Sequence, residues 1–316
     1  MSELVANTLF LLDATLYNST GLLFILLGIF ILIRVGGFPD LTIDGSFTIG
    51  AALFASSIVA GFSTPISMLI AAIGGVVGGL LTWIINQKLG VGKIVSGILT
   101  MIILTLTAPY LSGGSSVSLI NVDNFYSYIE SLDNSITHSI AKNLSFQLHF
   151  VFICIILSLT ALTVFTLILF LKTPIGLKLR YLGSAKKTLL IPKKQGQLLL
   201  LMALTLGNSL VAIGGAIEAQ RRGGFTVNMG TGIILVGLTA LILGESICKS
   251  YWRRSFLRIK ESIGAIAIGC VTYTLGVQLI LMIGIDFLDL RLITAIFLLL
   301  LLAFVGRRHS SSTQLF

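Results

Sequence analysis

Apolar runs long enough to cross a lipid bilayer recur along almost the whole of this chain. A helix needs roughly 20 mostly apolar residues to cross a hydrocarbon core of about 30 Å. None of the runs alternates strictly between apolar and polar residues as a barrel strand does, so their backbones must satisfy their hydrogen bonds as helices. The sequence therefore predicts an all-α, polytopic helical membrane protein with about nine transmembrane spans, or roughly eight to ten. The runs are Gly21 to Ile33, Ile49 to Phe62, Ile66 to Ile85, Ile94 to Leu111, Phe150 to Leu171, Leu198 to Ala216, Gly232 to Ile247, Ile263 to Ile283 and Leu292 to Val305.

The composition excludes an ordinary soluble domain. Of the 316 residues, 55% are hydrophobic and only 10% are charged, which is more apolar sequence than a soluble core of this size needs. The segment from Met1 to Tyr17 contains Glu3 and Asp13 but no lysine or arginine, so it lacks the basic region of a cleavable signal peptide. We therefore expect this segment to be retained, and residues 1–316 to form a single transmembrane domain.

Basic residues fall almost entirely on alternate connecting segments. Lysine and arginine are enriched in the cytoplasmic loops of membrane proteins. One set of alternate segments holds 17 of the 21 basic residues, at 34, 88–93, 172–197, 249–260 and 307–308. The pattern predicts a cytoplasmic carboxyl terminus and an external amino terminus. The net charge of +9 then reflects this topology and attraction to anionic membrane lipid, and it indicates no nucleic-acid partner, because no soluble domain carries the basic residues.

The chain lacks the motifs of several functional classes. It has no G-x-x-x-x-G-K-[ST] phosphate loop, so we expect any ATP hydrolysis to occur on a separate chain. It also lacks a G-x-S-x-G elbow and an H-E-x-x-H motif, which argues against an intramembrane enzyme. The three cysteines and three histidines are scattered and do not have metal-ligand spacing. The sequence therefore predicts no catalytic residue, no metal site and no cofactor.

Two glycine-rich polar segments interrupt the apolar pattern. The first, residues 36–50, combines Pro39 with clustered glycines and two carboxylates, and the second covers residues 223–232. Such sequences cannot continue a regular lipid-facing helix, and transport sites often lie where helices break near the middle of the membrane. We take their polar residues as candidates for lining a translocation path: Asp40, Thr42, Asp44, Ser46, Asn228 and Thr231.

The sequence leaves two interpretations of Asp40 and Asp44 open. In the first interpretation, they are a solvated loop carboxylate and a helix amino-terminal cap, and Asp44 is suited to be the cap. In the second, they line the translocation path or form a structural link to a neighbouring span. Both broken segments contain Gly-Gly-Phe and, at the same distance beyond it, a further glycine, Gly45 and Gly232. The charge pattern puts the two segments in opposite orientation, which hints at inverted-repeat halves.

Two connecting segments stand out by length or charge. Residues 112–147 form the longest non-apolar stretch, and the predicted topology makes them an extracytoplasmic loop of a length that often contacts partners. Residues 172–197 are basic, contain no carboxylate and are predicted to be cytoplasmic. Thr173 and Pro174 begin a short amphipathic stretch in this second segment. The stretch either serves only to set the topology or forms a docking helix for a cytoplasmic motor, since a helix this short is unstable unless docked.

Three stretches of the chain resemble a known family of transporters. They are Phe38 to Phe47, Lys172 to Arg180, and Asn228-Met229-Gly230 together with Leu241 to Glu245. They are similar to the permease subunits of ABC importers related to the branched-chain amino acid permeases, and more narrowly to the branch of uncharacterised substrate. The resemblance implies a permease of the bacterial inner membrane that works as a dimer around a central path, with a cytoplasmic ABC ATPase and an extracytoplasmic solute-binding protein as partners.

In that family a coupling helix follows the fifth span and meets the ATPase. The resemblance maps this helix onto Gly176 to roughly Pro192. It implies that residues 172–197, which contain the helix, are a cytoplasmic coupling loop. The implied ATPase-coupling candidates are Gly176, Lys178, Arg180, Gly183, Lys186 and Lys187.

The sequence thus predicts the transmembrane subunit of an ATP-driven importer rather than an enzyme. It would form the translocation path for a small solute, an amino acid or a vitamin-like compound, delivered by a binding protein. The alternative is an ATP-independent secondary transporter or channel that couples to ions through Asp40 and Asp44.

We predict that Lys186 and Lys187 react with a membrane-impermeant amine reagent only from the cytoplasmic side. The basic segment that carries them faces inward if the charge pattern sets the topology. Mass spectrometry of labelled whole cells and of inside-out vesicles measures this directly. Labelling of either lysine in intact cells would contradict the topology.

Overall fold

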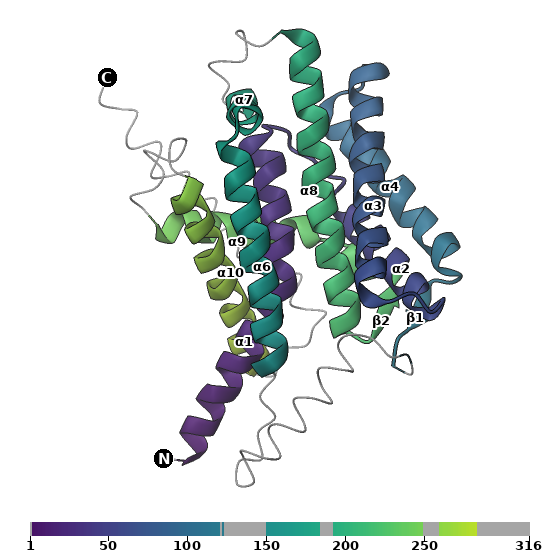
Figure 1. Cartoon of the computed structure of the whole chain (residues 1–316). Helices are drawn as coiled ribbons and strands as arrows, with labels where there is room; N and C mark the ends of the chain where they lie inside the picture. Colours follow the sequence, from purple (N-terminus) through teal and green to yellow (C-terminus); the bar gives the residue numbers. More distant parts are fainter. Residues whose placement is uncertain (1, 121, 123–149, 184–191, 249–258, 283–316) are drawn as a thin grey trace. The chain divides into compact units, whose positions relative to one another are not determined.

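The computed structural model describes residues 2–120, 122, 150–183, 192–248 and 259–282 (Figure 1). These residues are almost entirely helical, with one two-stranded sheet. The chain divides into a larger unit, Thr20–Ile233, and a smaller unit that combines Met1–Ser19 with Ile234–Phe316. A single domain over residues 1–316 stays a prediction.

The described residues form the following elements in chain order. They are α1 (Ser2–Ile29), η1 (Phe30–Val35), α2 (Ile43–Val59), α3 (Thr64–Trp83), η2 (Ile84–Lys88), α4 (Lys93–Ser112), β1 (Ser116–Ser118), α6 (Phe150–Lys172), α7 (Pro174–Gly183), α8 (Lys193–Arg221), β2 (Gly224–Thr226), η4 (Val227–Gly230), α9 (Ile233–Ile247) and α10 (Ile259–Met282). The turns η1 and η2 are π-helical extensions of α1 and α3, whereas η4 is a 3-10 turn.

Eight of the nine predicted apolar runs coincide with helices, and the ninth, Leu292 to Val305, lies outside the described residues. Six described helices are long and apolar enough to cross a membrane, or seven if the bent pair α6 and α7 counts as one span. The prediction of about nine spans is therefore not confirmed. One reason is α2, which has only 17 residues and is shorter than a span because the chain before it is irregular.

Helix α2 lies at the centre of the larger unit. It packs against α3, α4 and α8, and 13 of its 17 residues are buried (Figure 1). Small residues let the neighbouring backbones come close. A Cβ on Gly50 would collide with the Ala212 backbone of α8, and a Cβ on Gly215 would collide with the Phe47 backbone of α2. Such small-residue contacts are how helices associate in lipid, where the hydrophobic effect does not drive them together.

Helices α3 and α8 approach each other in the same way. A Cβ on Gly75 would collide with the Asn208 carbonyl, and one on Gly79 would lie 2.5 Å from the Leu204 carbonyl oxygen. The glycine cluster of α3 therefore serves close helix packing. Both glycines of α3 contact the backbone of α8, so the α8 backbone at Leu204 and Asn208 forms the other side of this packing.

The basic segments of the larger unit gather at one end of α8. The indole of Trp83 donates a hydrogen bond to the Gln197 carbonyl (2.9 Å), and the Lys93 ammonium donates to the Gly37 carbonyl (3.3 Å). A helix of 29 residues is about 43 Å long, enough to cross a membrane, so the other end of α8 lies on the opposite face.

That other end carries the two-stranded sheet. Strand β1, at the start of the predicted loop 112–147, pairs antiparallel with β2, which follows α8. Both segments therefore lie on one face, as alternation of the spans requires. Glu218 accepts hydrogen bonds from Arg221 and Arg222, two of the four basic residues outside the basic set. Their charges are thus partly offset on the face predicted to be external.

In the smaller unit, α9 and α10 also pack through glycine. Gly244 of α9 lies against the Ala265 and Gly269 backbone of α10, and Gly269 lies against the Ala240 carbonyl. The buried Cys270 thiol donates to the Ser19 carbonyl (3.4 Å). The close approach again relies on the absence of side chains at the crossing.

We predict that Gly79→Ala lowers the free energy of unfolding by roughly 1–3 kcal/mol, because the added methyl must push the α8 backbone away. Thermal unfolding of the purified protein in detergent measures the loss. Gly264→Ala in α10 is the matched control, since no described atom lies within 4 Å of its Cβ position. Equal melting temperatures for the two variants would contradict tight α3–α8 packing.

Candidate functional site

The chain breaks between η1 and α2. Gly37 adopts a positive φ of 61°, which other residues rarely take, and Phe38 turns inward and is fully buried. Pro39 follows and cannot donate a backbone hydrogen bond. Gly97 of α4 lies against the backbone at Leu41, where a Cβ would be 2.7 Å from the Leu41 nitrogen. The broken segment, residues 36–42, therefore alternates between buried and more exposed residues, and its backbone is bonded to η1 at Gly36 and Phe38 before the chain turns into α2.

Side chains supply part of what the broken backbone has lost. Asp40 is fully buried, and its Oδ1 accepts a hydrogen bond from the Thr42 backbone N–H (2.9 Å). Its Oδ2 accepts from the Asn208 amide of α8 (2.7 Å), and the Asn208 Oδ1 accepts from the Ser46 hydroxyl (2.7 Å). The Thr42 hydroxyl lies 2.6 Å from that of Thr82 in α3. This polar network ties the start of α2 to α3 and α8.

Every side chain in this network is buried away from solvent. Burying polar groups in an apolar interior costs free energy unless they are hydrogen-bonded. Here each carboxylate oxygen of Asp40 has a donor, and Asn208 uses both its donor and its acceptor. The network therefore fixes the register of the broken segment against α8.

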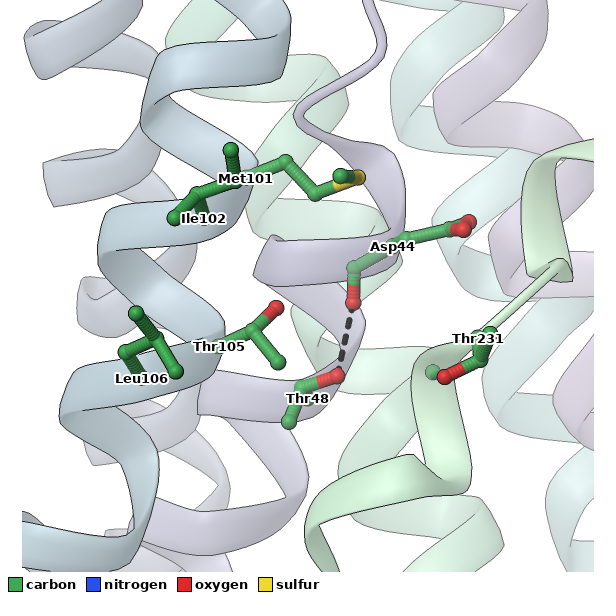
Figure 2. A pocket seen from close by; sticks show the side chains of 8 residues that line it. Asp44, Thr48, Met101, Ile102, Thr105, Leu106 and Thr231 are labelled. Atoms are coloured by element: carbon green, nitrogen blue, oxygen red, sulfur yellow. Dashed lines mark hydrogen bonds between the residues drawn. The ribbon is translucent and has the colours of Figure 1, made fainter.

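A cleft of about 220 Å³ lies beside the start of α2 (Figure 2). Three segments of the larger unit supply its walls: α2, α4, and the turn between η4 and α9. The lining residues are Asp44, Thr48, Met101, Ile102, Thr105, Leu106, Gly230 and Thr231.

Asp44 connects two walls of this cleft. Its Oδ2 accepts a hydrogen bond from the Gly232 N–H (2.9 Å), 188 residues further along the chain. Gly230 packs directly on α2, since a Cβ there would collide with the Thr48 hydroxyl and the Asp44 carbonyl. The second broken segment is thereby held against the first.

The predicted path residues fall into three groups. Asp40, Thr42 and Ser46 lie in the buried network and do not line the cleft. Asp44 and Thr231 meet at the cleft, while Asn228 is exposed in η4 and does not line it. A role of any of these residues in translocation stays a prediction.

The interpretation of Asp44 as an amino-terminal cap is wrong. Helix α2 begins at Ile43 with Thr42 in the cap position, and no side chain makes a capping hydrogen bond there. Asp44 already lies in the first turn, so its carboxylate is directed to Gly232 instead. The alternative interpretation, a link to a neighbouring span, describes this contact. Asp40 is likewise not a solvated loop carboxylate, because it is fully buried.

The two Gly-Gly-Phe stretches share a buried phenylalanine, Phe38 and Phe225. Each also has one glycine with positive φ, but it is the second glycine of the first stretch, Gly37, and the first glycine of the second, Gly223. Beyond that they differ, because the first continues as an irregular segment and the second as β2 and η4. Inverted-repeat halves therefore stay a prediction.

At the basic end of the larger unit, α7 forms a crosswise helix. It is bent by 86° from the preceding α6, and Figure 1 shows it nearly end-on above that helix. The Thr173 hydroxyl accepts a hydrogen bond from the Gly176 N–H (3.2 Å) and so caps the helix start. The short amphipathic stretch that begins at Thr173 thus forms a helix, and its role as a docking helix for a cytoplasmic motor stays a prediction.

Glycines hold α7 in place. A Cβ on Gly176 would collide with the Phe170 carbonyl, and one on Gly183 would lie 2.5 Å from the Val35 carbonyl. Leu179 is buried between these contacts, whereas Ile175, Leu177, Lys178 and Tyr181 are exposed. The helix therefore presents a mixed apolar and basic face outward.

The coupling candidates divide accordingly. Gly176 and Gly183 dock α7, Lys178 is exposed, and Arg180 is half-buried. Lys186 and Lys187 lie outside the described residues.

Asn208, Thr48 and Thr105 were not among the residues predicted from the sequence. Asn208 carried a usable signal, because a polar side chain in the middle of an apolar run marks a buried hydrogen-bonding site. The two threonines carried none, since threonine is common in membrane helices and only the packing brings these two to the cleft. Among the described residues, no group of three or more His, Cys, Asp or Glu side chains could hold a metal ion.

Apolar helices of spanning length around a broken, polar segment define a multi-pass membrane protein built for transport. The chain belongs to the family described as branched-chain amino acid transport system, permease component, which it matches over residues 11–305. It is thus a permease subunit and not a member of an enzyme family.

Two relatives show the same similarity over most of their lengths. The tyrosine transport system permease protein of Clostridioides difficile (strain R20291) is 31% identical over 277 residues, which cover 88% of this chain and 85% of that protein. An uncharacterised protein of Rickettsia prowazekii (strain Madrid E) is 30% identical over 297 residues, 94% of this chain and 98% of that protein. No solved structure matches the chain.

We predict that Asn208→Ala lowers the free energy of unfolding by about 1–3 kcal/mol, because it leaves Asp40 Oδ2 and the Ser46 hydroxyl buried without their partner. Thermal unfolding in detergent measures the effect. Ser209→Ala, at the neighbouring position outside the network, is the control and should change little. A wild-type melting temperature for Asn208→Ala would contradict the role of the network.

Proposed function

We propose that this protein is the transmembrane subunit of an ATP-driven importer of the bacterial inner membrane, with its amino terminus outside and its carboxyl terminus in the cytoplasm. A separate ABC ATPase supplies the energy, and an external binding protein delivers a small solute. The similarity to a tyrosine permease favours an amino acid as that solute. Two copies of the permease enclose the path.

The observation that carries this proposal is α7. This ten-residue helix lies across the end of the bundle, and its glycines pack against neighbouring backbone. It exposes Leu177 and Lys178, so a partner ATPase could bind it and transmit a conformational change to the permease. An isolated helix this short would not be stable, so its docking on α6, η1 and α8 is needed for such contact.

The route from α7 towards the cleft is short. Gly183 at the end of α7 lies against Gly37, where a Cβ on Gly37 would be 2.9 Å from the Gly183 Cα. From Gly37 the chain runs through the broken segment to Asp44 at the cleft. A shift of α7 can therefore reach the path through a few residues, which is how ATP binding on a partner would favour one state of the permease over another.

We expect Lys178→Glu and Leu177→Asp to weaken binding of the ATPase about tenfold or more, because they reverse a charge or place one on the exposed face of α7. Co-purification of permease and ATPase, followed by ATP-dependent uptake into proteoliposomes, measures both steps. The matched control is Lys88→Glu, an exposed lysine in η2 outside residues 172–197.

Normal ATPase binding and uptake in both α7 variants would contradict the docking role. Solute uptake by the permease without any ATPase would favour a secondary transporter instead. Because both substitutions are on the surface, the variants should insert and fold as the wild type does.

A further inference from the structure

Helix α4 runs along the broken segment and the first turn of α2 in one register. Three contacts, spaced one helical turn apart along α4, join them. They pair Lys93 with Gly37, Gly97 with Leu41, and Met101 with Gly45. The two residues of each pair are 56 positions apart, so the chain from 37 to 45 and the first half of α4 lie parallel to each other. They therefore form one packed unit.

The first of the three contacts is electrostatic. The Lys93 ammonium donates a hydrogen bond to the Gly37 carbonyl (3.3 Å) and lies 5.6 Å from the centre of the Phe38 ring. A cation over the face of an aromatic ring is attracted to it. The other two contacts are steric, apart from a long hydrogen bond from the Thr42 hydroxyl to the Gly97 carbonyl (3.4 Å). Lys93 thus attaches the start of α4 to the broken segment, in addition to the packing further along the helix.

Gly37 lies between this lysine and α7. A Cβ on Gly37 would be 2.9 Å from the Gly183 Cα at the end of α7, while the carbonyl of the same residue accepts the Lys93 hydrogen bond. Coupling between distant sites is carried by contiguous packed groups and hydrogen bonds. A displacement of α7 can therefore pass to α4 through one residue of the broken segment.

Helix α4 carries half of the lining of the cleft. Four of the eight lining residues belong to it, and Figure 2 shows them on one helix: Met101, Ile102, Thr105 and Leu106. Two branches thus lead from Gly37 to the cleft. One follows the chain to Asp44, and the other passes through Lys93 to the α4 wall.

We propose that Lys93 is a positioning residue that couples movement of α7 to the α4 wall of the cleft. This inference rests on the proposed permease function and extends it, because the α2 and α4 walls then respond together when the partner ATPase moves α7. Without the Lys93 ammonium, α7 keeps its surface for the ATPase, but α4 loses its attraction to Gly37. ATP binding on the partner then changes the α4 wall less.

The reactivity of a thiol in the cleft measures the state of the α4 wall. Thr105→Cys introduces this thiol into the full-length permease, which is studied in lipid nanodiscs with its partner ATPase bound. Modification by N-ethylmaleimide is followed at this position by mass spectrometry, which separates it from modification of Cys154, Cys248 and Cys270. We expect trapping with ATP and vanadate to change the modification rate about threefold or more. No solute has to be identified for this measurement.

Three further substitutions assign the response to Lys93. Lys93→Met removes the charge and the donors but keeps an unbranched stem, and it should reduce the response to about half or less. Lys93→Arg keeps a cation that can donate to the carbonyl and lie over the ring, and it should retain the response. Lys88→Met, at an exposed lysine in η2, is the matched control and should also retain it. Melting temperature and co-purification of the ATPase should be unchanged in all three variants.

A full response in Lys93→Met would overturn the inference, and so would the absence of any response in the Thr105→Cys permease with Lys93 in place. Equal loss of the response in Lys93→Arg would also contradict it. A permease that binds no ATPase at all would overturn the proposed function together with this inference. Failure of the inference alone would leave ATPase binding and its dependence on Lys178 intact.

Discussion

The hydrogen bond from Asn208 to Asp40 is the interaction on which the arrangement of the larger unit depends. A chain that leaves its helix inside a membrane protein exposes backbone groups that lipid cannot satisfy. Asp40 satisfies one of these groups, because its Oδ1 accepts a hydrogen bond from the Thr42 N–H. Its Oδ2 accepts a hydrogen bond from the Asn208 side chain of α8. The break between η1 and α2 is therefore stabilised by Asn208 of α8, and this contact helps to fix where α2 begins against α8.

Close helix packing and the polar network support each other. Gly75 lies on the Asn208 backbone, and Gly50 and Gly215 bring α2 and α8 together. Without these glycines the side chains of Asp40 and Asn208 would be too far apart to bond. Conversely, the hydrogen bonds select one register among the several that small residues would permit.

Helix α7 and the cleft of the larger unit are joined by one short stretch of chain. Residues 36–44 touch α7 at Gly37, α8 at Asp40 and the turn before α9 at Asp44. The broken segment is thus in contact with the outward-facing helix at one end and with the cleft at the other. A regular helix in place of residues 36–42 could not make the Gly37 contact in this way, because Gly37 adopts a positive φ of 61°.

The sequence by itself determined the helical membrane class, the break before α2 and the short helix after Thr173, because apolar length and helix-breaking residues act locally along the chain. It also singled out Asp40 and Asp44. Only the tertiary structure decided that Asp40 is a buried link to Asn208, that Asp44 binds Gly232 across the cleft, and that α2 is too short to count as a span. The physical reason is that these outcomes depend on contacts between residues up to 188 positions apart, whose geometry the helix packing sets.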